Sequence, residues 1–193
     1  MNPAEMQIIV LAGNASPRKD PHAPSAPDQG TGSFPLLLSR ATAIAGHAVS
    51  VVLGAQAAEI APALGRLPVS VVVNRDWSEG IAASIRAGIV SLPGSCSAAL
   101  LLFAEQTAVS SADLQRLADT WRRSPRSIVA AQYGGRRGLP AIFPRAEFPA
   151  LLRLRGEQGP EVLLRSPTVE LIGVHMPSAA ANAGRADEKP SES

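Results

Sequence analysis

Cysteine and aromatic residues are scarce in this chain of 193 residues. The single cysteine, Cys96, excludes an internal disulfide, and an aromatic content of 4% argues against a platform for stacking nucleic-acid bases. Neither sign of charge dominates, because 18 basic residues face 16 acidic ones. The formal charge of +2 is too small to predict binding to DNA or RNA, so we expect no nucleic-acid partner.

Long apolar runs are also absent, since charged residues, proline or glycine interrupt each of them. No window approaches the length of a membrane span. The N-terminal segment lacks the basic stretch and long apolar run of a secretory signal. We therefore expect a cytoplasmic protein with no membrane partner.

The sequence does contain 46% hydrophobic residues, enough for one domain with an aliphatic core. Two segments differ from the rest in composition. Residues 17–35 hold five prolines together with Ser, Gly and Asp, and residues 177–193 are small, polar and charged. We expect one domain over 1–176, with a flexible proline-rich insertion at 17–35, followed by a disordered tail at 177–193.

Short apolar runs alternate with segments of helical spacing along this domain. The runs predict strands over 7–11, 49–53, 69–73, 98–103, 127–131, 141–143 and 169–174. The helical spacing predicts helices over 36–45, 56–64, 80–92, 110–121, 146–154 and 161–165. Ile81, Ile85 and Ile89, for example, mark one buried helix face. Such alternation predicts an α/β fold with three α/β/α layers, a mostly parallel sheet and right-handed crossovers.

Ligands of such sheets bind where the parallel strands end. The loop after the first strand combines Leu11, Ala12 and Gly13 with Arg18. Its glycine lets the backbone approach a ligand, and its guanidinium suits phosphate oxygens. An ordinary turn with a solvated Arg18 explains these residues equally well.

Two further strands end in candidate site residues. Asn74 to Gly80 lead into a helix whose free N-terminal amides could receive a phosphate or a carboxylate. The residues alone favour an ordinary alternative, in which Asn74 forms a turn and Ser78 is the helix N-cap. Glu105 could hold a divalent cation that bridges nucleotide phosphates, although single carboxylates are common in ordinary loops.

A glycine- and arginine-rich segment over 133–140 could wrap an anionic ligand. The alternative is a hairpin with solvated arginines. The histidines are scattered and Cys96 has no cysteine partner, so no zinc site and no cysteine–histidine pair is suggested.

Taken together, these segments resemble the MobA-like NTP transferases of molybdenum-cofactor biosynthesis, in particular their cytidylyltransferase branch. The strongest stretch is VVVNRDWSEGIAASIRAG over 71–88, similar to the family's Asn, Trp, Gly, Ser and Gly at the same spacings. Residues 100–109 look like its Leu-Leu-Gly-Asp-Gln-Pro-x-Val, residues 133–143 like its Tyr-x-Gly-x-x-Gly-His-Pro-x-x-Phe, and residues 156–159 like its Gly-Asp-x-Gly. The resemblance implies a Rossmann-like nucleotide-diphospho-sugar transferase fold of the glycosyltransferase-A type.

The resemblance also implies a reaction: transfer of a nucleotidyl group, CMP from CTP or its GTP counterpart, to the molybdopterin cofactor, with release of pyrophosphate and with Mg²⁺ on the phosphates. The implied catalytic residues are Arg18 and Glu105, and Glu105 is the implied metal ligand. The implied nucleotide-binding residues are Leu11, Ala12, Gly13, Asn74, Gly80 and Ser84. The implied substrate-binding residues are Arg137, Gly138 and Pro140. A molybdoenzyme or its maturation chaperone is a further implied partner.

The chain departs from the family pattern at several positions. Arg18 falls one position late, and no lysine precedes the paired Leu36 and Leu37. Glu105 stands where the family has Asp, Leu139 stands where it has His, and the closing Asp-x-Asp-Thr-Pro-Glu-Asp segment has no counterpart. Whether the chain is an enzyme therefore stays open. One alternative is a relative that binds the cofactor, a nucleotide or a partner enzyme without turnover, and another is a sugar-phosphate nucleotidyltransferase.

Overall fold

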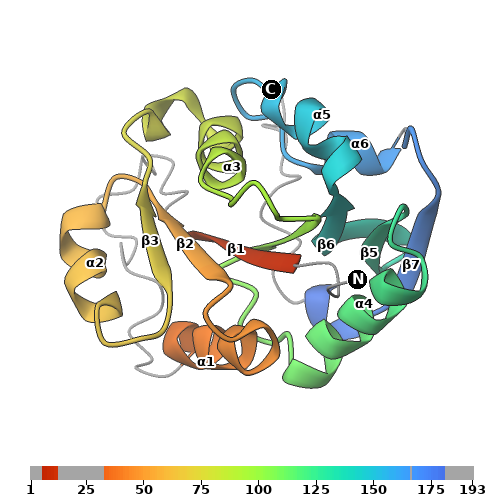
Figure 1. The fold of residues 1–193 in the computed structure, drawn as a ribbon, viewed down its shortest axis with the longest axis horizontal. Helices are drawn as coiled ribbons and strands as arrows, with labels where there is room; N and C mark the ends of the chain where they lie inside the picture. The colour runs from red at the N-terminus through yellow and green to blue at the C-terminus, as the bar shows by residue number, and fades with distance from the viewer. Residues whose placement is uncertain (1–5, 13–32, 166, 181–193) are drawn as a thin grey trace, which may run out of the picture.

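The computed structural model describes residues 6–12, 33–165 and 167–180, which form a seven-stranded sheet between two layers of helices (Figure 1). The strands are β1 (Met6–Ala12), β2 (Val49–Leu53), β3 (Ser70–Val73), β4 (Ala98–Phe103), β5 (Ile128–Tyr133), β6 (Arg136–Pro144) and β7 (Leu171–His175). The helices are α1 (Ser33–Ala45), α2 (Ala57–Leu64), α3 (Ile81–Val90), α4 (Ser111–Arg123), α5 (Phe148–Leu152) and α6 (Glu161–Arg165), with 3₁₀ turns at Trp77–Glu79 and Arg145–Glu147. The predicted three-layer α/β fold is confirmed. None of the helices described here has both the length and the apolar content to cross a membrane.

The strands are ordered β3-β2-β1-β4-β6-β5-β7, and every pair is parallel except those that β6 makes with β4 and β5. The prediction for β6 was too short, because it began the strand at 141 and left 134–140 as a loop. Gly134 and Gly135 instead form a tight turn with φ of 55° and 74°, and β6 starts at once as the second arm of a hairpin with β5.

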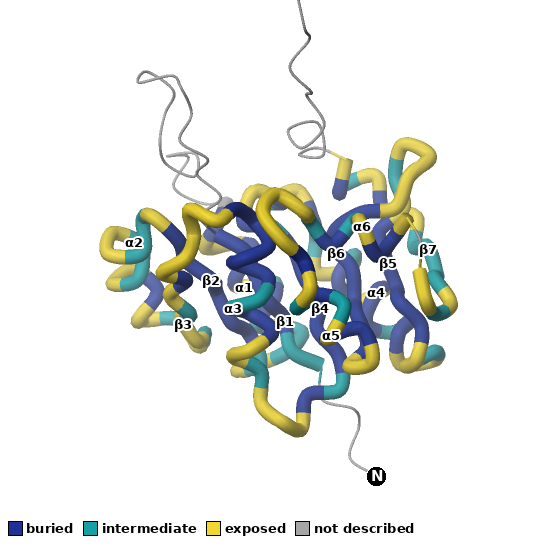
Figure 2. The backbone as a smooth tube through the Cα atoms, turned by 90° about the horizontal axis from the view of Figure 1, so that it is seen from above, coloured by how far each residue is buried: buried dark blue, intermediate teal, exposed yellow. Residues whose placement is uncertain are grey.

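The strands are buried on both faces, so alternate residues feed two separate cores (Figure 2). Ile8 and Val10 of β1 face α1 and α4, while Ile9 and Leu11 face α3, α5 and α6. The predicted apolar face of α3 lies in the second core, where Ile85 is fully buried. The two edge strands, β3 and β7, are more exposed than the strands between them.

The end of the predicted insertion and the start of the predicted tail both belong to helical segments in the structure. The last residues assigned to the insertion, 33–35, belong to α1, because Phe34 packs into the core and a proline is tolerated in the first turn of a helix. Residues 177–180, assigned to the tail, form a helical turn because Met176 and Ala179 are buried in the same core. The other residues of the predicted insertion and tail lie outside the described ranges.

Candidate functional site

The loops predicted to bind ligands meet at the end of the sheet where the parallel strands finish, which is the edge meant below. Leu11 pairs with Phe103 of β4, and Ala12 pairs with Leu53, which in turn pairs with Val73 of β3, so these strands end together. The antiparallel β6 begins at this edge, since Leu101 of β4 pairs with Ala141. The structure therefore brings Ala12, Asn74, Glu105 and Arg137 to one side of the molecule. Gly13 and Arg18 lie outside the described residues.

Leu11 and Ala12 are strand residues whose side chains pack into the two hydrophobic cores. Leu11 is 3% exposed and packs on the α3 side, whereas Ala12 is 7% exposed and packs on the α1 side. The carbonyl of Leu11 accepts a hydrogen bond from the backbone N–H of Ala104 at 3.0 Å. A nucleotide at this point would therefore meet backbone rather than these two side chains.

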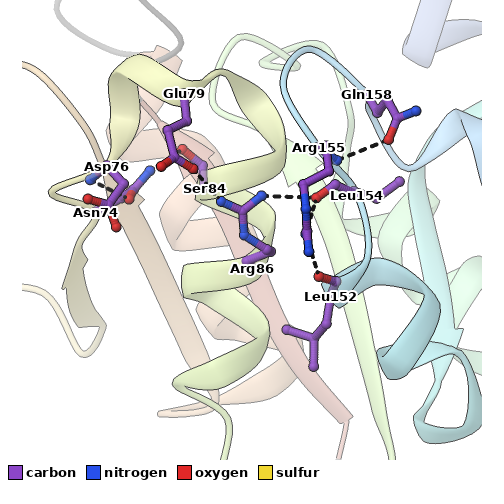
Figure 3. Close-up of polar contacts among 9 residues, drawn as sticks. All are labelled: Asn74, Asp76, Glu79, Ser84, Arg86, Leu152, Leu154, Arg155 and Gln158. Carbon is purple, nitrogen blue, oxygen red and sulfur yellow. Dashed lines mark hydrogen bonds and ion pairs between the residues drawn. The ribbon is translucent and has the colours of Figure 1, made fainter.

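Asn74 and Ser84 bind each other at the end of β3 (Figure 3). Both are buried, at 4% and 6% exposed, and Nδ2 of Asn74 donates to Oγ of Ser84 at 3.1 Å. Oδ1 of Asn74 accepts from the backbone N–H of Asp76 at 3.0 Å, which closes a turn. The interpretation of Asn74 as a turn former is confirmed. The assignment of Ser78 as N-cap is wrong, because Gly80 occupies the N-cap of α3 and no side chain caps it.

The N-terminus of α3 is covered by the loop that follows α5. The backbone N–H of Ala82 donates to the carbonyl of Gly156 at 3.1 Å, so one of the amides predicted to be free for an anion is already satisfied. Gly80 has a φ of +98°, and a Cβ at this position would lie 2.5 Å from the same carbonyl oxygen. Both observations require glycine at position 80.

Arg86 of α3 holds this loop on the helix, and Arg155 stabilises the loop from within (Figure 3). Nη1 of Arg86 donates to the carbonyl of Leu154 at 2.9 Å, and Nη2 pairs with Oε2 of Glu79 at 2.7 Å. Arg155 donates through its backbone N–H to Oε1 of Gln158 at 3.0 Å and through Nη1 to the carbonyl of Leu154 at 2.9 Å. The loop that resembles the family's Gly-Asp-x-Gly thus forms one unit with the start of α3.

Glu105 is an exposed residue just beyond the end of β4. A carboxylate suits Mg²⁺, which usually takes one or two protein carboxylates and completes its shell with water and substrate phosphates. Glu105 therefore fits an ion shared with a nucleotide. Within the described ranges no three His, Cys, Asp or Glu side chains gather into a metal-binding group.

Two residues that were not predicted for the site, Gln106 and Arg40, brace the turn that carries Glu105. Gln106 is 5% exposed; its Oε1 accepts from the backbone N–H of Phe103 at 3.0 Å, and its Nε2 donates to the carbonyl of Leu139 at 2.7 Å. Arg40 of α1 donates through Nη1 to the carbonyls of residues 107 and 109 at 2.7 and 2.8 Å. The match of Glu105 and Gln106 to an Asp-Gln pair was the available signal for Gln106; no local signal pointed to Arg40.

The hairpin between β5 and β6 carries the predicted substrate residues. Arg137 is exposed, whereas Gly138 and Pro140 are buried. A Cβ at Gly138 would lie 3.0 Å from Cζ of Tyr133, so the ring of Tyr133 needs the glycine opposite it. The guanidinium of Arg136 lies 5.6 Å from the centre of that ring. The alternative of a hairpin with exposed arginines is confirmed, and its exposed Arg137 is available to an anion.

Comparison with known proteins decides the family. The sequence model of the MobA-like NTP transferase domain matches residues 8–171. The chain belongs to this family. A search of curated proteins found no match for it.

Solved structures of the same fold cover nearly the whole MobA-like chain. Rv0371c from Mycobacterium tuberculosis H37Rv is 25% identical with a TM-score of 0.78, over 92% of this chain and 90% of that one. Its complex with manganese gives 22% identity and a TM-score of 0.66, over 90% and 89%. A nucleotidyl transferase from Methanothermobacter is 18% identical with a TM-score of 0.64, over 91% and 90%. The family resemblance and the Rossmann-like α/β fold are confirmed, and the roles of individual site residues stay predictions.

Proposed function

We propose that this MobA-like, nucleotidyltransferase-like protein transfers CMP from CTP to the molybdopterin cofactor and releases pyrophosphate. The observation that carries the proposal is the β3–α3 motif, which resembles the pattern of the MobA-like family and whose residues contact one another in the structure. Asn74 is hydrogen-bonded to Ser84, and Gly80 lies against the carbonyl of Gly156. The motif lies at the same edge of the sheet as Glu105.

The proposed chemistry needs positioning and charge stabilisation more than covalent catalysis. A phosphate oxygen of the cofactor attacks the α-phosphorus of CTP, the bond to the bridging oxygen breaks, and pyrophosphate leaves. A bound magnesium ion supplies charge neutralisation on the phosphates. Glu105 would hold that ion, the Asn74–Ser84 pair would fix the loop beside the nucleotide, and Arg137 would face the acceptor. The manganese complex of Rv0371c supports a divalent ion in this family.

The test is a pyrophosphate assay with CTP, Mg²⁺ and molybdenum-loaded cofactor, and a parallel arm with GTP in place of CTP. We expect release with CTP, and its loss in Glu105→Ala. Glu59→Ala, an exposed carboxylate on α2, is the matched control and should keep full release. Release no greater than that of Glu105→Ala would overturn the proposal. The buried single Cys96 fits a protein that works in the reducing cytoplasm.

A second function, cofactor binding without turnover, is favoured by β6, which we call the acceptor strand because it carries the predicted substrate-binding residues. Leu139, which replaces the family's histidine, is 1% exposed, and its carbonyl is held by Gln106. Such a protein would pass bound cofactor to a molybdoenzyme or its maturation chaperone. Cofactor binding by calorimetry, with no pyrophosphate release at saturating CTP, would support this function, and measurable release would contradict it.

A further inference from the structure

Gln106 is a buried polar side chain at the open edge of the sheet. Its amide makes two hydrogen bonds that together link neighbouring strands, one from the N–H of Phe103 on β4 and one to the carbonyl of Leu139 on β6. A buried amide that loses its partners costs more than an exposed one, so this geometry resists rearrangement.

The two bonds end at residues next to the candidate ligands. Phe103 is the last residue of β4, two positions before Glu105, and Leu139 lies between Gly138 and Pro140. The backbone directly after β4 turns sharply, since the N–H of Thr107 donates to the carbonyl of Glu105 at 2.8 Å. The amide of Gln106 therefore fixes the turn of Glu105 directly against the acceptor strand.

We propose that Gln106 is a positioning residue that fixes the Glu105 carboxylate relative to β6. The metal bound by Glu105 would then keep a fixed position relative to the acceptor. The inference rests on the proposed function. Mg²⁺ demands a near-ideal octahedron, and groups that hold a ligand in place commonly control metal affinity. Glutamate reaches one methylene further than aspartate, which makes a fixed backbone at Glu105 more important.

Arg40 supports the turn from the opposite side. Its Nη1 binds the two carbonyls that follow Gln106, at 107 and 109, so the turn is held between α1 and β6. Loss of Gln106 would then release the side of the turn that faces the acceptor strand while leaving the other side attached. We expect altered metal geometry rather than an unfolded turn.

The experiment measures the magnesium dependence of CTP binding by calorimetry, which needs no turnover. Gln106→Met keeps the length of the side chain and removes both bonds, and should raise the half-saturating Mg²⁺ concentration about tenfold. Gln106→Asn keeps the same groups but is shorter by one methylene, so it can retain one bond at most and should raise that concentration about threefold. Gln106→Asn also serves if Gln106→Met fails to fold.

Glu147→Met is the matched control, because Glu147 is also buried, accepts a hydrogen bond from Thr168 at 2.7 Å, and follows the opposite end of β6. It should lower the melting temperature without changing the magnesium dependence. Equal magnesium dependence in the unmodified protein and both Gln106 variants would overturn the inference alone. Absence of magnesium-dependent CTP binding in the unmodified protein would overturn the proposed function itself, together with this inference.

Discussion

Asn74 and Glu105 both follow a parallel strand at the same edge of the sheet, yet Asn74 is 4% exposed while Glu105 is an exposed residue. Asn74 belongs to a region in which protein groups satisfy one another: Ser84 on one side, and the loop at 156 over the helix N-terminus on the other. Glu105 and Arg137 are instead exposed, and the turn that carries Glu105 is braced by Gln106. Under the proposed function, the β3–α3 region would fix the backbone beside the nucleotide, and the β4–β6 region would supply the charged side chains.

The largest expected effect tests the β3–α3 region. Gly80→Ala should lower the free energy of unfolding by about 3 kcal/mol, because the new methyl group meets the carbonyl of Gly156 and φ is positive. Gly94→Ala is the control, since no atom lies within 4 Å of its Cβ position, and it should change stability by less than about 0.5 kcal/mol. Urea denaturation measures both. Equal effects would mean that Gly80 neither packs against the loop at 156 nor needs its positive φ.

A smaller effect is expected from the Asn74–Ser84 pair. Asn74→Ala should cost about 2 kcal/mol of stability, because it leaves the buried Ser84 hydroxyl and the N–H of Asp76 without their partner. Ser84→Ala should cost less, and the double variant should cost less than the sum of the two. Additive effects in urea denaturation would contradict a direct bond between the two side chains.

Asp113, at the start of α4, provides a reference away from both regions. Burial acts to raise the pKa of its carboxyl group, but hydrogen bonds from the Ser110 backbone and hydroxyl, from Ser178 and from Arg116 outweigh burial and lower the pKa to about 2. A pKa below the ordinary value of 3.8 means that this stability is present above about pH 4 and is lost as the pH falls towards 2.

Asp113→Asn should therefore cost about 1–2 kcal/mol at pH 7 and almost nothing near pH 2, after allowance for solvent screening. Urea denaturation of both proteins across this range measures the difference. Ser178→Ala should show part of the same pH dependence, because its hydroxyl donates to Oδ2 of Asp113 at 2.8 Å. A difference that does not change with pH would show that these bonds do not depend on the charge of Asp113.

The smallest effect on stability is expected for the exposed Arg137 on β6. Arg137→Ala should change the free energy of unfolding by less than about 0.5 kcal/mol, since the side chain is exposed. Under the proposed function it should nevertheless raise the KM for the molybdopterin cofactor about tenfold and leave the KM for CTP unchanged. Arg123→Ala on α4, also exposed, should change neither constant. A higher KM for CTP in Arg137→Ala would place Arg137 on the nucleotide side instead.

The parallel part of the fold could be predicted because its signals are local. The buried face of α3 is visible as Ile81, Ile85 and Ile89, and the strands at 49–53 and 98–103 have the predicted bounds. The start of β6 could not be predicted in this way. Its glycines and arginines resemble a loop, and its strand character comes from the hairpin with β5, in which Tyr133 pairs with Arg136 and Ala131 with Gly138.

The candidate site is limited by contacts between segments that lie far apart in the sequence. The motif residues Asn74, Gly80 and Glu105 could be selected from the sequence because they follow strands and match a family pattern. The carbonyl of Gly156 over α3 and the guanidinium of Arg40 under the Glu105 turn could not, since each contact joins segments more than sixty residues apart. Long-range contacts of this kind decide which backbone groups are left for a ligand.

The hairpin between β5 and β6 also has a kinetic consequence. Tyr133 and Arg136 pair across a two-residue turn, whereas Met6 of β1 finds its partner at Ala98 of β4. Closing the short loop costs far less chain entropy than closing the long one. The acceptor strand can therefore order before the nucleotide side exists. The turn that carries Glu105 and Gln106 is bonded to both β4 and β6, so we expect it to take its final shape only after these two strands have paired.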